Sequence, residues 1–246
     1  MARMGGSKHL KRAAAPAAWK IPRKTHKFTI RTAPGPHPKD ESYPLAVLVR
    51  DVLKLVKTHR EAKVAIKEGK ILVDGVVRRA LNFPVGLMDI IDIPSIGKAY
   101  RILPTPNNPL NPVEVESNGE KKLKLCRVKT KTTIKGGIIQ YGLHDGRTIR
   151  AVNGDATLKP DDTLLIEVPT QKVIEAYRME PGSLALVVKG KMAGRIGRIT
   201  GVKPGTITRP KMVTLKFDEE ESEVPARLLL VVGRDKPALT IPGWAG

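Results

Sequence analysis

The stretch THREAKVAIKEGKILVDGVV, residues 58–77, carries a helix start, a helix stop and a hairpin signal within one short segment. Thr58 and Glu61 have the spacing of a capping box, in which the hydroxyl and the carboxylate bind free N–H groups at a helix start. Gly69 suits a helix end because glycine tolerates the left-handed conformation. Asp74-Gly75 lies between apolar residues and predicts a tight turn between two short strands.

Basic residues recur on one face of this predicted helix. Arg60, Lys63, Lys67 and Lys70 follow at i, i+3, i+7 and i+10. Residues 44–56 predict an earlier helix that begins near Pro44, because their apolar spacing matches one helical face. A second basic row falls on that helix, at Arg50, Lys54 and Lys57. The rows are either an ordinary solvated face or a surface that contacts phosphates, and two clustered rows favour phosphate contact.

The composition indicates a polyanionic partner. The chain has 246 residues, a formal net charge of +20 and a pI of about 10.2. Its length predicts two or three domains, and a charge of this size on a small protein favours nucleic acid. Only 4% of residues are aromatic, which argues against a protein that reads single-stranded bases by stacking. Contact with phosphates and RNA shape fits better.

The first 39 residues contain ten Lys or Arg and no acid, half of the net charge. Residues 1–43 are also rich in Ala, Pro and Gly, so they predict an extended basic arm that is disordered without a partner. Trp19, Ile21, Phe28 and Ile30 indicate that part of the arm docks, on RNA or on the next domain. A flexible solubilising tail and a membrane-surface helix are the alternatives, and the prolines disfavour the helix.

The remainder of the chain predicts β structure. Residues 104–112, PTPNNPLNP, are typical of a linker. Residues 113–175 predict several strands, with a hairpin at Leu143–Gly146 and a turn at Pro160–Asp162. A basic run here has either a solvated or an RNA-contacting role, and the sequence leaves both open: Lys121, Lys122, Lys124, Arg127, Lys129, Lys131 and Lys135. The single cysteine, Cys126, excludes an internal disulfide and is expected in a buried strand.

Signals for catalysis, metals and membranes are weak. No Walker loop or Gly-x-Ser-x-Gly elbow occurs, and the five histidines lack ligand-like partners at i+3 or i+4. We therefore expect no cofactor, no metal, no small-molecule substrate and no enzyme activity. No apolar run reaches a membrane-spanning length, and the charged N-terminus lacks the apolar core of a secretory signal, so we expect a cytoplasmic protein.

Several motifs resemble known RNA-binding families. Residues 59–77 followed by MDIIDI resemble the S-four RNA-binding module, and residues 186–199 resemble the KOW motif of ribosomal proteins and elongation factors. KHLKRAAAPAAW (8–19), GPHP (35–38), HDGRTIR (144–150) and PARLLLVVGRDKPALTIP (225–242) stand in the order typical of the S-four-e family of archaeal and eukaryotic small-subunit ribosomal proteins. Gly146-Arg147-Thr148-Ile149 also echoes RNA pseudouridine synthases, but their catalytic Asp does not follow.

The resemblance implies a structural protein of the small ribosomal subunit, whose partners are small-subunit ribosomal RNA and neighbouring ribosomal proteins. It implies no homo-oligomer. A pseudouridine synthase and a KOW-containing transcription or translation factor are the alternatives. The acidic run Asp218–Glu221 is expected to point away from RNA as a solvated turn.

The expected fold is α+β and multi-domain. It comprises a basic arm (1–43), a small α/β S-four-type RNA-binding domain (44–105), a central β-barrel or sandwich-like domain (106–175), and a C-terminal KOW, SH3-like small β-barrel with a tail (176–246). The predicted RNA-binding residues are Arg3, Lys8, Lys11, Arg12, Trp19, Lys20, Arg23, Lys24, Lys27, Arg50, Lys54, Lys57, Arg60, Lys63, Lys67, Lys70, Lys129, Lys131, Arg147, Lys191, Arg195 and Arg198.

Overall fold

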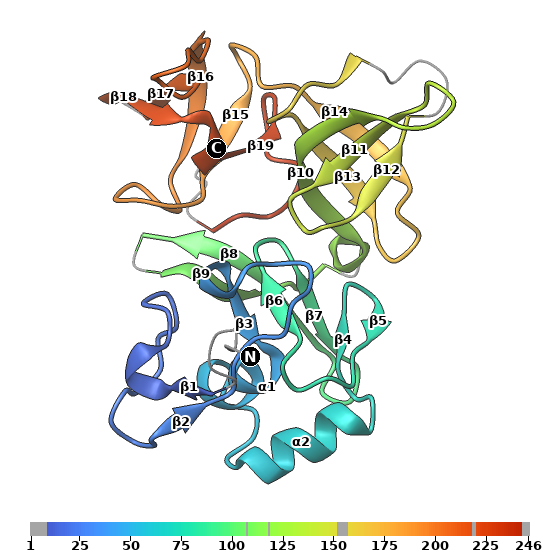
Figure 1. The fold of residues 1–246 in the computed structure, drawn as a ribbon, viewed down its shortest axis with the longest axis vertical. Helices are drawn as coiled ribbons and strands as arrows, with labels where there is room; N and C mark the ends of the chain where they lie inside the picture. Colours follow the sequence, from blue (N-terminus) through green and yellow to red (C-terminus); the bar gives the residue numbers. More distant parts are fainter. Residues whose placement is uncertain (1–8, 107, 118, 152–156, 218–219, 243–246) are drawn as a thin grey trace, which may run out of the picture.

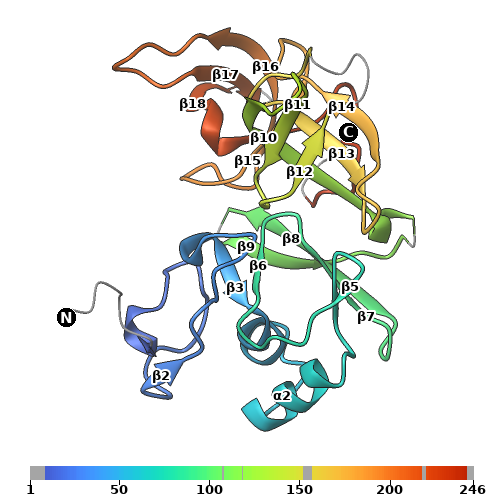
Figure 2. The same cartoon turned by 45° about the vertical axis from the view of Figure 1, so that its right-hand side comes forward.

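The computed structural model describes residues 9–106, 108–117, 119–151, 157–217 and 220–242. The fold is mostly β with few helices, and it forms two lobes along the long axis (Figures 1 and 2). We call the described residues up to 117 the N-terminal lobe and those from 119 onward the C-terminal lobe. No helix in the described ranges is long and apolar enough to cross a membrane.

The N-terminal lobe contains the arm and the predicted RNA-binding module. Its helices are α1 (Leu45–Val47) and α2 (His59–Lys67), with a π-helical turn at Leu48–Val52 and 3-10 turns at Arg12–Ala14 and Lys39–Glu41. Its strands are β1 (Leu10–Lys11), β2 (Phe28–Thr29), β3 (Ser42–Pro44), β4 (Leu72–Val73), β5 (Val76–Val77), β6 (Pro84–Gly86), β7 (Ile90–Ile93), β8 (Lys98–Thr105) and β9 (Asn108–Glu114).

The C-terminal lobe consists of strands apart from 3-10 turns at Glu120–Lys122 and Ala226–Leu228. Its strands are β10 (Leu123–Thr133), β11 (Ile139–Leu143), β12 (Thr148–Arg150), β13 (Thr163–Glu167), β14 (Val173–Tyr177), β15 (Leu184–Val187), β16 (Ile196–Lys203), β17 (Met212–Phe217), β18 (Glu220–Pro225) and β19 (Leu229–Gly233). The predicted strands and hairpin of residues 113–175 are therefore largely confirmed, and Cys126 lies buried in β10.

Antiparallel pairing organises the described strands into three five-stranded sheets. The N-terminal lobe holds the order β5-β4-β7-β8-β9, and the C-terminal lobe holds β12-β11-β10-β13-β14 and β18-β17-β16-β15-β19. The long strand β10 pairs with β13 through its first half and with β11 through its second half. The pairs β1-β2 and β3-β6 complete the topology in the N-terminal lobe.

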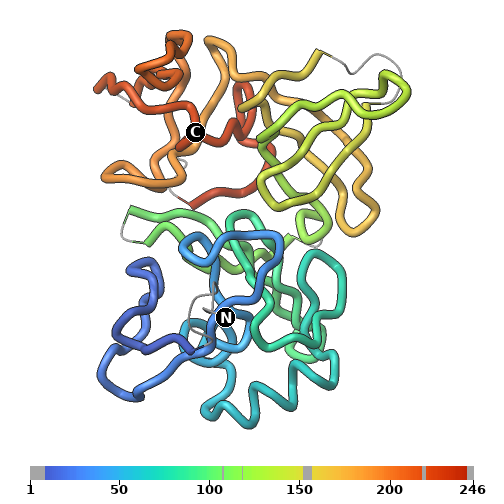
Figure 3. Tube along the Cα trace, in the orientation of Figure 1, coloured from blue at the N-terminus to red at the C-terminus, as the bar shows by residue number. Residues whose placement is uncertain are grey.

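The two lobes are in direct contact. A Cβ on Gly75 would lie 3.0 Å from Cδ of Pro169, and one on Gly194 would lie 2.7 Å from Cα of Thr105. The tube trace shows the β8–β9 hairpin running beneath the C-terminal lobe (Figure 3). Leu103 of β8 belongs to the apolar core of the β15–β19 sheet. The lobes therefore share core packing, which fixes their relative placement.

The predicted linker at residues 104–112 is wrong, because residues 104–105 end β8 and residues 108–112 belong to β9. β9 pairs with β8 along its length, from Thr105↔Asn108 to Tyr100↔Glu114. The prolines that suggested a linker are tolerated here for two reasons. β9 is an edge strand, and the register shifts next to Pro104 between Leu103 and Thr105, both positions where a missing N–H does little harm. The predicted domain limits, including the one at residue 105, stay a prediction.

The predicted helix over residues 44–56 is wrong in its length. Pro44 ends β3, α1 spans three residues, and the chain then widens into the π-helical turn. Leu53 N donates to Leu48 O at 2.8 Å, an i→i+5 bond. Lys54 has a φ of 53°, in the left-handed region, so the helical conformation does not continue through it. The apolar spacing is satisfied by this compact turn instead of a four-turn helix.

For the described residues 9–43 the predicted disorder is wrong, whereas the predicted docking of part of the arm on the next domain is confirmed for Trp19 and Ile21. Trp19 is 1% exposed, stacks near Tyr43, and donates its Nε1–H to Ser42 O at 2.7 Å. Leu10 and Ile21 are buried in the same core as α1 and α2. Burying one such side chain contributes about 1.5–3 kcal/mol. The arm therefore docks on the module and is ordered without RNA.

Candidate nucleic-acid interface

Helix α2 presents the predicted basic row to solvent. Its capping box forms as predicted, because Glu61 N donates to Thr58 Oγ1 at 3.2 Å and the Glu61 carboxylate accepts from the Thr58 amide at 3.4 Å. The Lys57 amide also donates to this carboxylate and is the main cause of the lowered pKa of Glu61. Ala62 and Ile66 face the core, which fixes the helix rotation.

The outer face of α2 forms a shallow groove lined by Arg60, Lys63, Val64, Lys67 and Glu68. The three basic residues are exposed, and the helix lies at the end of the molecule farthest from the C-terminal lobe (Figure 1). Three cations therefore lie on one solvent-facing surface. We call Arg60, Lys63 and Lys67 the α2 face.

A tight hairpin follows α2 in the chain. β4 pairs with β5, and Asp74 and Gly75 at the turn have φ values of 52° and 73°, as a type I′ turn requires. Gly69 ends α2 with a φ of 79°, and a Cβ there would lie 3.7 Å from Nη2 of Arg79. Arg79 is exposed at the end of α2. Sequence reasoning missed it, although its place after the hairpin strand was a usable signal.

The remaining predicted residues of the module do not extend the α2 face as a helical row. Arg50 donates to the Asp51 carboxylate at 2.8 Å, and Lys70 lies 2.6 Å from the Glu68 carboxylate. Lys54 and Lys57 are exposed in the coil that leads to α2. The second basic row, predicted for Arg50, Lys54 and Lys57, is therefore wrong as a helix face.

Several arm residues are engaged inside the protein. Arg12 is 2% exposed, bonds to Pro22 O, and lies 3.4 Å from Asp51. Arg23 donates to the carbonyls of Ala15 at 2.6 Å and Pro16 at 2.9 Å. The burial of Arg12 and Trp19 prevents direct RNA contact in this conformation, so we remove both from the interface.

Other predicted basic residues remain exposed or lie outside the described structure. Lys11, Lys20, Lys24 and Lys27 are exposed on the arm, whereas Arg3 and Lys8 lie outside the described residues. Lys129 and Lys131 are exposed on β10, where Lys131 Nζ donates to Leu158 O at 3.2 Å. Their contact with RNA stays a prediction.

The predicted residues of the KOW-like segment lie around β15 and β16. Lys191, Arg195 and Arg198 are all exposed. Arg195 stacks 5.0 Å from the ring centre of Phe217 and lies 3.8 Å from Glu220. Glu220 belongs to the acidic run that was expected to point away from RNA, so the surface is not sorted by charge at this point. Residues 218–219 of that run lie outside the described residues.

A buried ionic cluster joins the two lobes and holds another predicted RNA-binding residue. Lys124 is 0% exposed, and its Nζ lies 2.7 Å from Asp74, 2.5 Å from Asp89 and 3.0 Å from Asp145. Arg147 bonds to Asp74 at 2.6 Å and Asp145 at 3.3 Å. We call these five residues the interlobe cluster. Arg147 was predicted to bind RNA; two of its nitrogens bind carboxylates within the protein, and its contact with RNA stays a prediction.

Charge pairing sets the protonation of the cluster. Burial alone would lower the pKa of Lys124, but the carboxylates of Asp89 and Asp74 raise it well above its ordinary value. Burial alone would raise the pKa of Asp89 and of Asp145, but neighbouring positive groups lower both, Lys124 among them. Burial is the main cause of the raised pKa of Asp74. Lys124 is therefore held as an ammonium ion.

Two histidines border the cluster. His37 Nε2 lies 3.1 Å from the Asp89 carboxylate, which ties the arm to the joint. His144 Nδ1 accepts from the Arg127 amide at 3.2 Å, while its Nε2 lies 3.3 Å from Leu87 O. Burial lowers the pKa of His144 to about 4. Cys126, His144 and Asp145 place potential ligand atoms within 4.8 Å of one another, but Asp145 is already engaged by Lys124, which disfavours a cation there.

Comparison with known proteins identifies the parts of this architecture. A model of the ribosomal S4e family matches residues 96–173, the RS4NT (NUC023) domain matches residues 4–40, and the S4 domain matches residues 44–91. The S4 match covers α1, α2 and the hairpin that carry the α2 face. The resemblance inferred from the sequence motifs is therefore confirmed for the module and for the family.

Full-length relatives and a solved structure agree. The small ribosomal subunit protein eS4 of Korarchaeum cryptofilum is 45% identical over 241 residues, which cover 98% of this chain and 100% of that protein. The eS4 protein of Methanocaldococcus jannaschii is 42% identical over 248 residues, covering 98% and 100%. The crystal structure of the 30S ribosomal protein S4e from Thermoplasma acidophilum matches with a TM-score of 0.68 and 30% identity, covering 80% of this chain and 97% of that one. This chain belongs to the S4e family of small-subunit ribosomal proteins.

Proposed function

We propose that this chain is a structural component of the small ribosomal subunit and binds small-subunit ribosomal RNA through the α2 face. The observation that carries the proposal is the exposed row Arg60, Lys63 and Lys67 within an S4 domain. A protein that neutralises phosphates with such a row releases counterions, so its affinity for RNA falls steeply with salt. The rigid capped helix holds the three cations at helical spacing without a further ordering step.

The same proposal defines the partners of the chain and its location in the cell. The chain acts in the cytoplasm as part of the ribosome, beside neighbouring ribosomal proteins, and it supports translation without a cofactor, a small-molecule substrate or catalysis of its own. It takes part as one copy and not as a homo-oligomer. Its membership of a ribosomal protein family supports this role.

The C-terminal sheet supplies a second proposed RNA contact. We infer that β15 to β19 form a KOW-type barrel and that Lys191, Arg195 and Arg198 project from it toward RNA. Their exposure supports this role. The pairing of Arg195 with Glu220 makes its contribution smaller than that of a residue on the α2 face.

Charge reversal of the α2 face tests the proposal. In the variant Arg60→Glu, Lys63→Glu, Lys67→Glu, the affinity for deproteinised archaeal small-subunit ribosomal RNA should fall by more than about tenfold. This is a loss of more than about 1.4 kcal/mol in binding free energy. A matched control reverses the exposed Lys98, Lys203 and Lys236, two of which are paired with Glu114 and Glu223. Filter binding and circular dichroism of all three proteins give affinity and folding. Equal affinities for the folded variants would exclude the α2 face.

A further inference from the structure

An open groove with a volume of about 760 Å³ lies between the two lobes. We call it the arm groove. On the N-terminal side it is lined by residues 31–39 of the arm and by Asn82, and on the C-terminal side by Lys129, Leu143, His144 and Gly146. It therefore contains parts of two motifs from the sequence, GPHP at residues 35–38 and HDGRTIR at residues 144–150. The RNA contacts at α2 and around β15 and β16 use neither motif.

The charged side chains that line the arm groove are basic. They are Arg31, Lys39 and Lys129, and the described lining contains no carboxylate. Arg31 and Lys129 are exposed and Lys39 is half-buried, so all three are accessible to solvent. Lys39 and Lys129 form no ion pair within the described part of the chain. His144 is neutral near pH 7, because burial lowers its pKa to about 4.

The acids closest to the groove in sequence do not line it. Asp145 belongs to the turn that forms one wall, but its side chain is 1% exposed and lies 3.0 Å from Nζ of Lys124. Asp40 and Glu41 line a neighbouring cavity instead, and Glu41 is bound there by Lys189. The sign of the arm groove is therefore set by its three cations.

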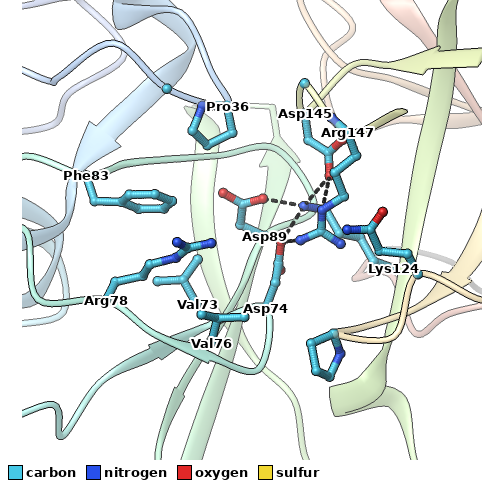
Figure 4. A pocket seen from close by; sticks show the side chains of 14 residues that line it. Pro36, Val73, Asp74, Val76, Arg78, Phe83, Asp89, Lys124, Asp145 and Arg147 are labelled. Carbon is cyan, nitrogen blue, oxygen red and sulfur yellow. Dashed lines mark hydrogen bonds and ion pairs between the residues drawn. The ribbon is translucent and has the colours of Figure 1, made fainter. Parts of the chain in front are cut away.

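A second cleft at the joint is lined by groups of both signs (Figure 4). Pro36 borders both clefts. Asp74, Asp89 and Asp145 line only the second one, each within 3.0 Å of the Lys124 ammonium. Opposite charges are paired inside that cleft, so of these two clefts the arm groove is the one that offers unpaired positive charge to a ligand.

Both walls of the arm groove are held in place by the protein itself. Ala33 N donates to Asn82 O at 2.8 Å, and His37 Nε2 lies 3.1 Å from the Asp89 carboxylate. The opposite wall is the tight turn between β11 and β12, which its own backbone hydrogen bonds close. A ligand that enters a preformed groove loses less free energy to ordering of the protein.

The lining favours a chain of phosphates over other partners. Apart from two histidines it has no aromatic side chain on which bases could stack. Its one large aliphatic side chain, Leu143, is 3% exposed, so a protein partner finds no apolar anchor. Arg31 and Lys39 begin and end the arm segment, and Lys129 lies on the opposite wall. Cations at separate points of one groove match anionic groups that repeat along a backbone.

We propose that the arm groove binds the phosphodiester backbone of one strand of ribosomal RNA, with Arg31, Lys39 and Lys129 contacting its phosphates. The inference rests on the proposed function, which supplies RNA as the partner. A strand in this groove contacts both lobes at once, at a site separate from the α2 face. Lys129 was predicted as an RNA contact from the sequence, whereas Arg31 and Lys39 were not.

The salt dependence of RNA binding by the double variant Lys39→Gln, Lys129→Gln of the full-length chain tests the proposal. The slope of log Kobs against log salt should become shallower by about 2, and the affinity should fall by about tenfold. Adding Arg31→Gln should reduce the slope by about one more. Neither lysine forms an ion pair among the described residues, so the variant should fold, which circular dichroism checks.

The variant Lys172→Gln, Lys236→Gln is a matched control, because it removes the same charge at two exposed positions outside the groove lining. Its slope should equal that of the wild type. An unchanged slope in a folded Lys39→Gln, Lys129→Gln variant, or an equal change in the control, would overturn the groove assignment.

Phosphate-ethylation interference locates the contacts, because ethylated phosphates that block binding mark them. The groove variant should lose interference at neighbouring phosphates of one strand that the α2-face variant retains. A wild-type pattern in the groove variant, beside a changed pattern in the α2-face variant, would overturn the groove assignment alone. Absence of RNA binding by the wild-type chain would overturn the proposed function as well.

Inorganic phosphate and polyglutamate are probes for other anions in the groove. Each should bind the wild-type chain weakly, and RNA should displace it. Binding of polyglutamate that depends on Lys39 and Lys129 and persists with saturating RNA would assign the groove to an acidic peptide and overturn the proposal. The same result with inorganic phosphate would assign the groove to a small free anion, again against the proposal.

Discussion

Lys63 and Lys124 show two opposite fates of lysine in one basic sequence. Lys63 is exposed on α2 beside Arg60 and Lys67. Lys124 comes from the basic run of residues 121–135, yet it is fully buried among three carboxylates. The charge of Lys63 is available to an external polyanion. The charge of Lys124 is instead paired with carboxylates from both lobes. Charge in the sequence therefore does not by itself identify the RNA surface.

Replacing Lys124 should destabilise the buried interlobe cluster. In Lys124→Met, Asp74, Asp89 and Asp145 lose their shared ammonium partner. Removing one partner of a buried ion pair costs about 3–5 kcal/mol, so we expect a loss of this size in urea unfolding at neutral pH. Lys122→Met, at an exposed position two residues earlier, should change the free energy of unfolding by less than about 0.5 kcal/mol. Equal stability of the two variants would contradict the structural role of the cluster.

A fall in pH should destabilise the folded protein at the contact between the lobes, because His144 becomes protonated. Burial lowers its pKa from 6.5 to about 4, so between these values the unfolded chain binds a proton that the folded chain does not. Stability that is present above pH 6.5 is therefore lost as the pH falls toward 4, by about 3 kcal/mol in total. The groups that set this pKa are Lys124, Asp145, His37 and the Leu87 carbonyl.

Urea unfolding of the wild type and of His144→Gln, at about pH 7 and about pH 4.5, measures this effect. The glutamine variant should lose less stability across the window, because it has no proton to bind. Parallel losses in both proteins would assign the acid sensitivity to other groups.

Salt dependence should separate the two kinds of lysine. Lys63→Gln removes one exposed cation, so the slope of log Kobs for RNA against log salt should fall by about 1. Lys98→Gln, at an exposed site 3.0 Å from Glu114, should leave the slope unchanged. A slope that is the same for Lys63→Gln and the wild type would remove Lys63 from the phosphate contacts.

The smallest effect is expected at the helix cap. Thr58→Ala removes the hydroxyl that accepts from the Glu61 amide, at a cost of about 1 kcal/mol. It should weaken RNA binding only through fraying of the first turn, where Arg60 lies. Thermal unfolding of this variant measures its stability, and filter binding measures its affinity for RNA. A loss of affinity as large as that of the α2-face variant would mean that helix order, and not the three cations, controls binding.

Local signals predicted the local structure well. The capping box, the stop at Gly69 and the Asp74-Gly75 turn each depend on residues within a few positions, and all three formed as predicted. The family order of motifs likewise identified the S4 module, which the family match covers at residues 44–91.

Long-range contacts were not readable from the sequence. Trp19 bonds to Ser42, 23 residues away, and Lys124 meets Asp74, 50 residues away. Neither partner lies within a periodic pattern that could reveal the pairing. The prolines of β9 suggested a linker, but they lie in an edge strand, where proline is tolerated.

Sedimentation of cell lysate after a moderate salt wash tests the central claim most directly. Cells would carry the wild-type chain, the α2-face variant Arg60→Glu, Lys63→Glu, Lys67→Glu, or the control variant at Lys98, Lys203 and Lys236. We predict that the wild type and the control stay in the small-subunit peak at stoichiometric amounts, whereas the α2-face variant moves to light fractions. Wild-type chain mainly in light fractions, or an α2-face variant that stays in the small-subunit peak, would contradict the account.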